Sequence, residues 1–402
     1  MAVREPEGFP FRLLPEDFGT PSRLYAERQD CPVRQIRLPS GDLAHLVMDY
    51  DEVEMVLRDR RFSRNFRYDG APRLVAGDDM SLNPDAIVNL DPPEHTRLRR
   101  TIQWAFRPGN AKSWRPVVEG VAGGLLDEIV SAGPPADLVA DYARLLPIRV
   151  MCDLIGVPPG DQEKLISWTG VFFSTSAVSA RERGEAGMEF LSYIGHLVAT
   201  RRDDPGDGLV DALIKACDVD GALSEAELLQ MVPALLIGGQ ENTSAILARG
   251  IFTLLRNRQA YDALHADPGL LDGAVEEILR FEVPSEGAFL RVTTEDVELT
   301  SGTIPRGTAV QVSLPAANRS DEHFADPERF DVQRAQNPHL TFGAGAHFCV
   351  GAPLARLELK IALGAVTSRL PGLRLAAGTS VGDMRYAQDT LVRTLLSLPV
   401  SW

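Results

Sequence analysis

One cysteine in this 402-residue chain stands in a setting suited to metal binding. Cys349 lies within the segment 342–358, FGAGAHFCVGAPLARLE, among glycines at positions 343, 345 and 351. Glycine has no Cβ and adopts positive φ, so it lets backbone amides turn toward a sulfur and lets a flat ligand pack against the chain. From residue 352 the apolar spacing of three and four predicts a helix that begins just after the cysteine. The dipole of that helix would favour a thiolate at its N-terminus.

The order of these residues resembles the haem-binding loop of cytochromes P450, the haem-thiolate monooxygenases. The shared pattern is Phe-Gly-x-Gly-x-His-x-Cys-x-Gly followed by Leu-Ala-Arg-x-Glu. Six fixed positions at this spacing arise by chance in roughly one of a million sequences of this composition, which argues against a merely structural cysteine. The resemblance implies haem b with Cys349 as the axial ligand of the iron, and haem contacts from Phe342, Gly343, His347 and Gly351.

The composition is that of an ordinary globular protein, with 44% hydrophobic and 24% charged residues. No apolar run approaches the ~18 residues of a membrane span, and the N-terminal residues lack the apolar region of a signal peptide. Four scattered cysteines without a CxxC pair argue against a disulfide framework or a zinc site. We therefore expect a cytoplasmic protein without membrane contact. The net charge of −15 disfavours nucleic acid as a partner.

Local patterns predict a mainly α chain with a smaller β-rich portion (α+β). Residues 36–48 alternate like strands around a turn at Ser40-Gly41, and residues 292–313 return to that alternation. Between about 97 and 280 the pattern is mostly helical, with breaks at Pro and Gly. We find no repeat or long linker, so we expect a single domain over residues 1–402. The irregular stretch 61–90 matches the region that the P450 family uses as a substrate-facing lid.

The longest predicted helix spans about 225–257. Ser224 is a candidate N-cap, and Glu227 three residues later completes a capping box. Adjacent glycines at its centre, Gly238 and Gly239, cost about 1 kcal/mol each relative to alanine. A bound flat cofactor, an opening for a small ligand or a packing notch against another helix would offset that cost, and Pro233 is a candidate for a kink nearby. The resemblance makes this element the long central distal helix of the cytochrome P450 fold.

The centre of this helix supplies the catalytic candidates Glu241, Asn242 and Thr243. Residues 238–242, GGQEN, resemble the (Ala/Gly)-Gly-x-acid-Thr motif whose acid and alcohol guide protons to bound dioxygen in the family. Glu241 fits the acid. Asn242 stands where the motif has its alcohol, and a carboxamide donates a hydrogen bond but is a poor proton relay. Thr243 cannot simply take that place, because it is rotated about 100° around the helix from position 242. Three accounts stay open: protons from water or a substrate hydroxyl, a rearranged network around Glu241, or an oxidative coupling or ring closure.

The resemblance also assigns side chains to the haem propionates, which need cationic or donor partners. His95 and Arg99 lie four apart in PPEHTRLRR and so share one face of a predicted helix. Arg291 and His347 match the other two positions where the family binds propionates. The three segments that carry these four residues are far apart in the sequence.

A Glu-x-x-Arg motif resembles the buried ion pair of the family. Glu277 and Arg280 lie three apart on one helical face. In the family a further arginine from the segment before the haem loop completes the network, and DPERFDVQR offers Arg329 and Arg334, of which we favour Arg334. The expected role of this network is structural.

Family position nominates two segments that face the substrate, 283–290 and 389–392. Glu286 either meets a cationic or amide group of the substrate or faces solvent. Together with one residue of the distal helix, the candidates for the substrate pocket are Leu235, Pro284, Glu286, Ala288, Phe289 and Leu391.

The resemblance implies a soluble, monomeric enzyme of the bacterial P450 type that oxidises a small organic molecule. It would use O2 and electrons from NAD(P)H, delivered by ferredoxin and ferredoxin reductase, to tailor a secondary metabolite by hydroxylation or by oxidative C–C, C–O or C–N bond formation. Residues 97–115 hold six Lys and Arg and no Asp or Glu. This stretch is either a solvated face with haem contacts or a docking patch for an acidic electron donor.

Two alternatives to an enzyme that uses O2 and a redox partner remain. One is a peroxide-using or isomerising haem-thiolate enzyme that needs no redox partner, although the Arg-Pro pair usual in the distal helix of the peroxide-using type is absent. The other is a haem sensor or carrier without turnover, which only Asn242 favours.

Overall fold

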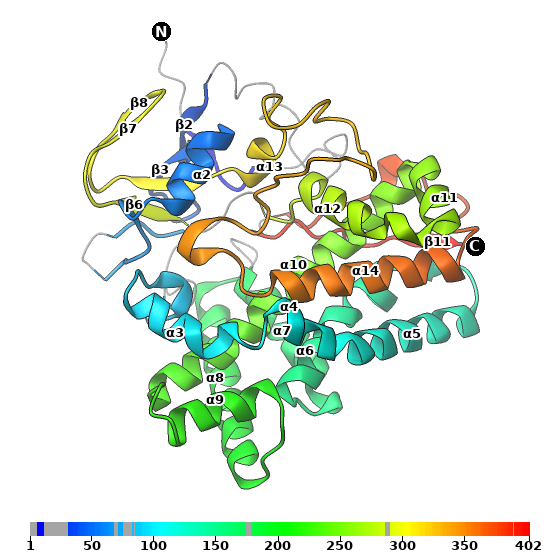
Figure 1. The fold of residues 1–402 in the computed structure, drawn as a ribbon, viewed down its shortest axis with the longest axis horizontal. Helices are drawn as coiled ribbons and strands as arrows, with labels where there is room; N and C mark the ends of the chain where they lie inside the picture. The colour runs from blue at the N-terminus through cyan, green and yellow to red at the C-terminus, as the bar shows by residue number, and fades with distance from the viewer. Residues whose placement is uncertain are drawn as a thin grey trace.

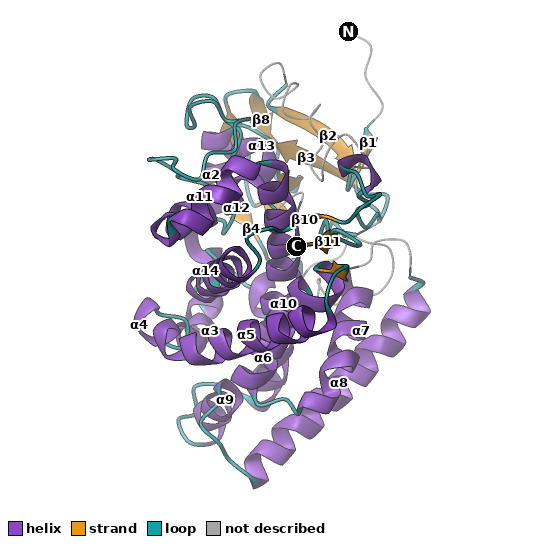
Figure 2. Ribbon diagram, turned by 90° about the vertical axis from the view of Figure 1, so that its right-hand side faces the viewer, coloured by secondary structure: helices purple, strands orange, loops and turns teal. Residues whose placement is uncertain are grey.

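The computed structural model describes residues 6–11, 31–67, 71–74, 83, 85–173, 178–285, 290–388 and 390–402. Helices make up most of this part of the chain, and the larger sheet lies at one end of the molecule (Figures 1 and 2). The mainly α fold with a smaller β-rich portion that the sequence predicts is therefore confirmed.

The larger sheet has six strands in the order β1-β2-β3-β9-β6-β4. β2 (Val33–Arg37) and β3 (Leu43–Val47) form an antiparallel pair joined by a turn in which Gly41 has φ 93°. At the centre of the sheet, β3 pairs in parallel with β9 (Ala309–Val312). The other strands are β1 (Glu7–Gly8), β6 (Arg291–Thr293) and β4 (Phe62–Ser63). The sheet therefore unites the two strand-like regions seen in the sequence.

Two small sheets complete the β portion. A hairpin joins β7 (Val297–Leu299) to β8 (Gly302–Ile304). The second sheet has the order β10-β11-β5, with β10 (Arg374–Leu375), β11 (Pro399–Ser401) and β5 (Ala136–Asp137). This second sheet ties the C-terminal residues to the helical part of the molecule.

The central helix α10 (Glu225–Arg256) matches the predicted span to within one residue at its C-terminal end. Ser224 and Glu227 form the predicted capping box, because the Ser224 hydroxyl accepts a bond from the Glu227 amide and the Glu227 carboxylate accepts one from the Ser224 amide. The helix packs against α6 (Leu145–Ile155), α14 (Ala352–Arg369) and α8 (Ala180–Asp203), and it runs through the middle of the molecule (Figure 1).

Further helices complete the described part of the fold. They are α2 (Tyr50–Arg58), α3 (Glu94–Gln103), α4 (Pro108–Ala111), α5 (Arg115–Ala132), α7 (Gln162–Phe173), α9 (Leu209–Asp218), α11 (Arg258–Ala266), α12 (Leu271–Phe281) and α13 (Leu314–Ala317), with the π-helix η5 (Val139–Ala143) and the 3₁₀ helices η3 (Ile87–Asn89), η4 (Lys112–Trp114), η6 (Pro159–Asp161), η7 (Pro268–Leu270), η8 (Gly345–His347) and η9 (Val381–Asp383).

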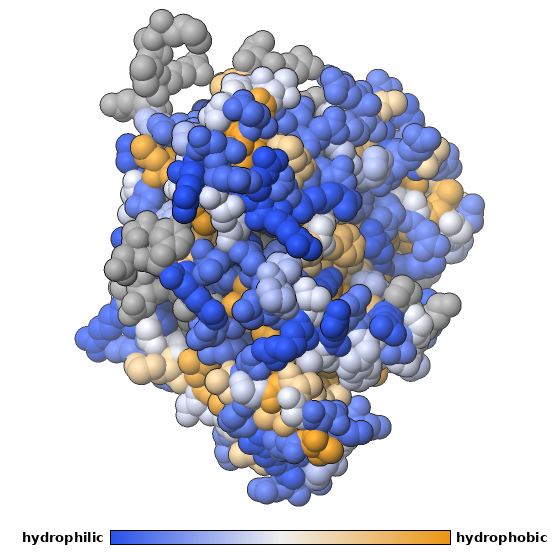
Figure 3. Space-filling model, turned by 60° about the vertical axis from the view of Figure 1, so that its left-hand side comes forward, coloured by the Kyte–Doolittle hydropathy of each residue, from blue (hydrophilic) through white to orange (hydrophobic). Residues whose placement is uncertain are grey.

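The largest core lies where α5, α6, α10 and α14 meet. Leu125, Ile148, Ile251 and Leu359, one from each helix, are fully buried there. On the face drawn in Figure 3, hydrophilic residues predominate and hydrophobic ones form small separate patches. Among the described residues, every helix is too short or too polar to span a membrane.

Candidate functional site

Cys349 lies on the loop between η8 and α14, with its backbone amide bound to the Phe342 carbonyl oxygen at 2.8 Å. Burial raises the pKa of its thiol, whereas hydrogen bonds from the Gly351 and Ala352 amides and the charge of Arg99 lower it. The side chain nevertheless keeps accessible surface. Its sulfur thus meets backbone donors in a residue that is still accessible, as a thiolate ligand requires.

Two glycines shape this loop through backbone conformation. Gly343 and Gly345 have φ of 70° and 71°, in the left-handed region that side chains disfavour. A Cβ on Gly345 would also lie 2.7 Å from the Leu57 carbonyl oxygen at the end of α2. The loop can therefore approach α2 this closely only with glycine at position 345.

The four predicted propionate ligands come together beside this loop. His95 on α3 and His347 on η8 have ring centroids 4.2 Å apart, and Arg99 donates to the Phe348 carbonyl oxygen at 2.6 Å. Burial lowers the pKa of His95 to about 4 and that of Arg291 to about 10. Burial and the surrounding positive charges lower the pKa of His347 to about 2.

The structure adds a residue to this cluster that the sequence analysis missed. Arg64, which is 3% exposed, donates to the carbonyl oxygens of Val88 (2.7 Å) and Leu290 and to the side chain of Asn89. Its charge helps to lower the pKa of His347. Arg64 stands among other arginines in a stretch without regular periodicity, so no local pattern distinguishes it.

This cluster fits the propionates of haem. The buried atoms Nδ1 of His95 and Nε2 of His347 have no hydrogen-bond partner among the described residues. Asp91 is the acid whose charge acts on His95, Arg64 and Arg291. Buried arginines together with buried ring nitrogens that have no partner favour a bound anionic group that can form hydrogen bonds. With the Cys349 sulfur next to them, these residues match the needs of haem.

The two glycines of α10 have different explanations. A Cβ on Gly239 would lie 2.7 Å from the Met151 sulfur on α6, so this glycine is a packing notch between two helices. A Cβ on Gly238 would meet no atom within 4 Å. Gly238 therefore leaves an open patch on the helix, which is compatible with the cofactor contact that the resemblance implies.

The three catalytic candidates occupy different environments on α10. Glu241 accepts a hydrogen bond from the Thr394 hydroxyl at 3.1 Å, and burial raises the pKa of its carboxyl although Thr394 and Arg144 act against that shift. Thr243 is buried and Asn242 is half-buried. A raised pKa lets Glu241 carry a proton at a higher pH than an exposed glutamate does.

Glu277 on α12 binds two arginines in the interior. Its carboxylate pairs with Arg280 at 2.8 Å, where neither side chain has any accessible surface, and with Arg334 at 3.0 Å. Arg329 instead pairs with Asp331 and keeps 67% of its side chain exposed. Of the two arginines that the sequence offered, Arg334 is therefore the one that contacts Glu277.

The two predicted substrate segments are adjacent where the structure describes them. The Pro284 carbonyl oxygen accepts from the Arg393 amide at 2.7 Å, and Ser285 forms an antiparallel bridge with Val392. Leu391 packs against the apolar cluster beneath the six-stranded sheet, and Leu235 on α10 is 7% exposed. Glu286, Ala288 and Phe289 lie outside the described residues, as does Asp389.

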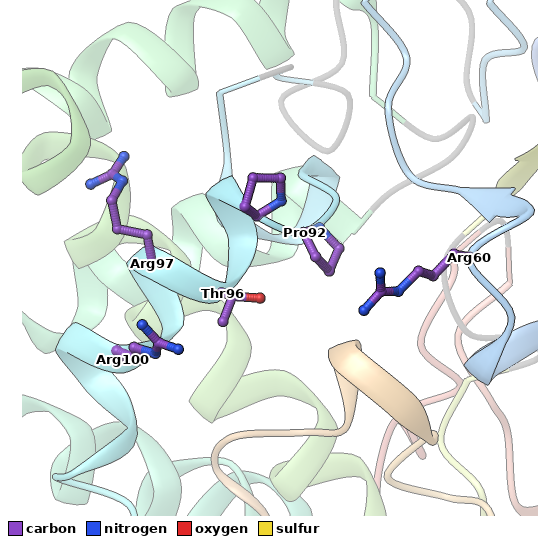
Figure 4. Close-up of a pocket in the computed structure, with 6 residues that line it drawn as sticks. Arg60, Pro92, Thr96, Arg97 and Arg100 are labelled. Carbon is purple, nitrogen blue, oxygen red and sulfur yellow. The ribbon is translucent and has the colours of Figure 1, made fainter.

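A basic pocket of about 460 Å³ opens between α3 and the turn that precedes β4. Figure 4 shows the Arg60 guanidinium and the Thr96 hydroxyl facing each other across it, with Arg100 below them. Arg97 points away and pairs with Glu227 on α10. The lining contains no carboxylate; its residues are Arg60, Pro92, Pro93, Thr96, Arg97 and Arg100.

Known proteins resemble this chain over nearly its whole length. The family model for cytochrome P450 matches residues 269–370. The mycinamicin IV hydroxylase/epoxidase of Micromonospora griseorubida is 41% identical, with all of both chains covered. The crystal structure of the putative thioether synthase SgvP, involved in the tailoring step of griseoviridin, has a TM-score of 0.93 and 36% identity over 99% of this chain and 100% of that one. Cytochrome P450mel 107F1, with biaryl coupling reactivity, has a TM-score of 0.90 and 33% identity over 96% and 97%.

Proposed function

Because the chain belongs to the cytochrome P450 family, we propose that it tailors a small secondary metabolite by oxidation at haem b bound through Cys349. Family membership itself implies haem and an oxidising enzyme. The observation that carries the proposal for this chain is the buried cluster of arginines and histidines next to Cys349. His95, Arg291 and His347 gather there from three distant segments, and the two ring nitrogens without a partner, His95 Nδ1 and His347 Nε2, would meet the propionates of haem.

The residues of the chain have separate tasks around that cofactor. Bound haem supplies an iron centre that activates dioxygen. The Gly351 and Ala352 amides and the Arg99 charge favour the thiolate form of Cys349. On α10, the raised pKa of the half-buried Glu241 carboxyl suits it to take up and release a proton, and Asn242 beside it offers an amide donor without relaying protons.

The outcome of the reaction is either oxygen insertion or oxidative bond formation. Relatives of this chain include a hydroxylase/epoxidase, a putative thioether synthase and a P450 with biaryl coupling reactivity. Asn242 favours bond formation only if no other hydroxyl replaces the missing alcohol, because hydrogen abstraction then matters more than relayed protons. If Asn242→Thr leaves product identity and turnover unchanged, this preference for bond formation is wrong.

For the electron donor, we propose an acidic ferredoxin that docks over the basic pocket. Arg60 and Arg100 point to solvent there, with no carboxylate in the lining. Phe348 is 40% exposed and directly precedes Cys349, and Trp104 at the end of α3 is 43% exposed. Exposed aromatic residues beside cationic ones suit an interface with an acidic partner.

The reduced carbon monoxide complex tests the haem assignment. We expect the red-shifted Soret band of a thiolate-ligated haem in the folded protein and its loss in Cys349→Ala, with Cys152→Ala as a control that keeps the band. Absence of the band in folded, haem-loaded protein, or its survival in Cys349→Ala, would contradict the proposal.

Turnover distinguishes the remaining alternatives. A screen for ligand-induced changes of spin state first selects substrates from candidate metabolites. With a surrogate ferredoxin, its reductase and O2, we expect NAD(P)H consumption coupled to product. Product formed with hydrogen peroxide alone, and none with the electron-transfer pair, would indicate the peroxide-using alternative. Failure of both systems would indicate a sensor or carrier.

A further inference from the structure

Glu241 is bound by a residue from the far end of the chain. The Thr394 hydroxyl donates to Glu241 Oε1 at 3.1 Å across 153 positions of sequence. Thr394 is half-buried, so its oxygen can accept a hydrogen bond from water while its proton points at the carboxylate. The hydroxyl that position 242 lacks is thus present next to the neighbouring acid, from another element.

The segment that carries Thr394 is fixed to the predicted substrate segment. Arg393, directly before it, is 3% exposed and donates its backbone amide to Pro284 at 2.7 Å. Its side chain donates to the Phe11 carbonyl oxygen at 3.1 Å, and Val392 forms the bridge to Ser285. The position of the Thr394 hydroxyl is therefore set by backbone contacts at the substrate pocket.

The same segment is also fixed to the chain just before η5, the helix that ends at Arg144. Arg144 is exposed and ends the π-helix η5, and its charge acts on Glu241. Asp137, just before η5, accepts bonds from the Ser397 hydroxyl at 2.7 Å and the Leu398 amide at 2.8 Å. Thr394 and Arg144, which both act on the Glu241 carboxyl, thus come from two segments that are hydrogen-bonded to each other. The segment of Arg144 reaches solvent at that residue.

We propose that Thr394 is a positioning residue for Glu241 and the hydroxyl through which protons reach that carboxyl from solvent, in place of the missing alcohol at position 242. In this relay a hydronium ion of the solvent gives a proton to Thr394 Oγ1 and becomes water, as Thr394 gives its own hydroxyl proton to the Glu241 carboxylate at Oε1. One O–H bond of Thr394 forms as another breaks, so the hydroxyl is regenerated and Glu241 gains one proton. The inference rests on the proposed function, because a proton supply at Glu241 serves dioxygen chemistry.

Infrared spectroscopy of the haem-loaded protein tests the contact without turnover. The carbonyl stretch of protonated Glu241 is identified by its loss in Glu241→Gln and followed as pH rises. We expect Thr394→Val, which replaces the hydroxyl by a methyl of similar size, to shift this band to higher wavenumber and to raise the pH at which it disappears. Thr394→Ser, which keeps the hydroxyl, should resemble the wild type in both respects.

Solvent isotope effects test the relay itself. With a surrogate ferredoxin and reductase, we expect Thr394→Val to slow NAD(P)H oxidation and to enlarge its solvent deuterium isotope effect, and Thr394→Ser to restore both. An unchanged Soret band of the carbon monoxide complex shows that each variant is folded and loaded.

Identical infrared bands and titrations in Thr394→Val and the wild type would overturn the positioning role, and an unchanged rate and isotope effect would overturn the relay. A wild type without the thiolate Soret band would instead contradict the proposed function, whatever the infrared measurement on Glu241 gives.

Discussion

The imidazole rings of His95 and His347 lie 4.2 Å apart, tilted by 43°, although they come from α3 and from the haem loop. Neither Nδ1 of His95 nor Nε2 of His347 has a hydrogen-bond partner among the described residues. Two buried ring nitrogens without a hydrogen-bond partner cost free energy unless a ligand meets them. The pair is therefore built to receive an anionic group, and this relationship supports haem in this chain more directly than the loop motif does.

The first prediction concerns retention of haem. His95→Ala should lower the fraction of haem-loaded protein and speed haem transfer to an excess of apomyoglobin, because it removes a donor for a propionate. The ratio of Soret to protein absorbance measures the first effect. His196→Ala, on the exposed face of α8, is the control and should leave haem content unchanged. Equal haem loss from both variants would argue against a propionate contact at His95.

The second prediction concerns the apoprotein and pH. His95 has a pKa of about 4 when folded, below its usual 6.5 because of burial. Below pH 6.5 the unfolded chain binds a proton that the folded chain refuses, so stability falls as pH drops from about 6.5 to about 4, by up to about 1.4 kcal/mol per pH unit. His95→Leu should flatten this slope in urea unfolding of the apoprotein. A slope equal to the wild type would contradict the pKa assigned to His95.

The third prediction separates two arginines of similar local sequence. Arg334→Ala leaves the buried Glu277 carboxylate short of one cation and should lower the free energy of unfolding by roughly 3 kcal/mol. Arg329→Ala removes an exposed pair with Asp331 and should cost less than about 1 kcal/mol. Denaturant unfolding monitored by circular dichroism gives both values. A reversed order would mean that the Glu277 network does not stabilise the fold through Arg334.

Sequence reasoning succeeded where the pattern is local. The capping box at Ser224 and Glu227 spans three residues, and the span of α10 followed from it and from apolar spacing. Arg64 was beyond reach because its acceptors at positions 88 and 290 lie 24 and 226 residues away. The bond between Thr394 and Glu241 could not be predicted for the same reason, because only the folded chain brings its C-terminal segment to α10.

Gly239 shows, at a single residue, the limit of what can be predicted from the sequence. Its cost in a helix was visible in the sequence, but the packing notch that explains it requires Met151 on α6, 88 positions earlier, to lie against it. Three explanations were therefore open for both glycines until the neighbouring helix was in place.

The fourth prediction follows from this difference between the glycines. Gly238→Ala meets open space and gains helix propensity, so it should stabilise the apoprotein by up to about 1 kcal/mol. Gly239→Ala gains the same propensity but pushes against the Met151 side chain, so it should stabilise less or destabilise. Thermal unfolding of the two apoprotein variants ranks them. If Gly239→Ala proves more stable than Gly238→Ala, the Met151 side chain moves aside without a cost in free energy, and packing against it does not explain the glycine.

The last prediction concerns the basic pocket. Arg100→Glu places a negative charge in a lining that has none, and an acidic ferredoxin should then reduce the enzyme roughly tenfold more slowly at low salt. The difference should shrink as ionic strength rises, because salt screens exposed charges beyond about 10 Å at 0.1 M. Stopped-flow reduction under carbon monoxide measures the rate without a substrate. Arg181→Glu makes the same change of charge at an exposed site on α8, where Arg181 pairs with its helical neighbour Glu185. If both variants slow reduction equally, net charge and not the pocket guides the donor; if only Arg100→Glu does so, the donor docks over α3.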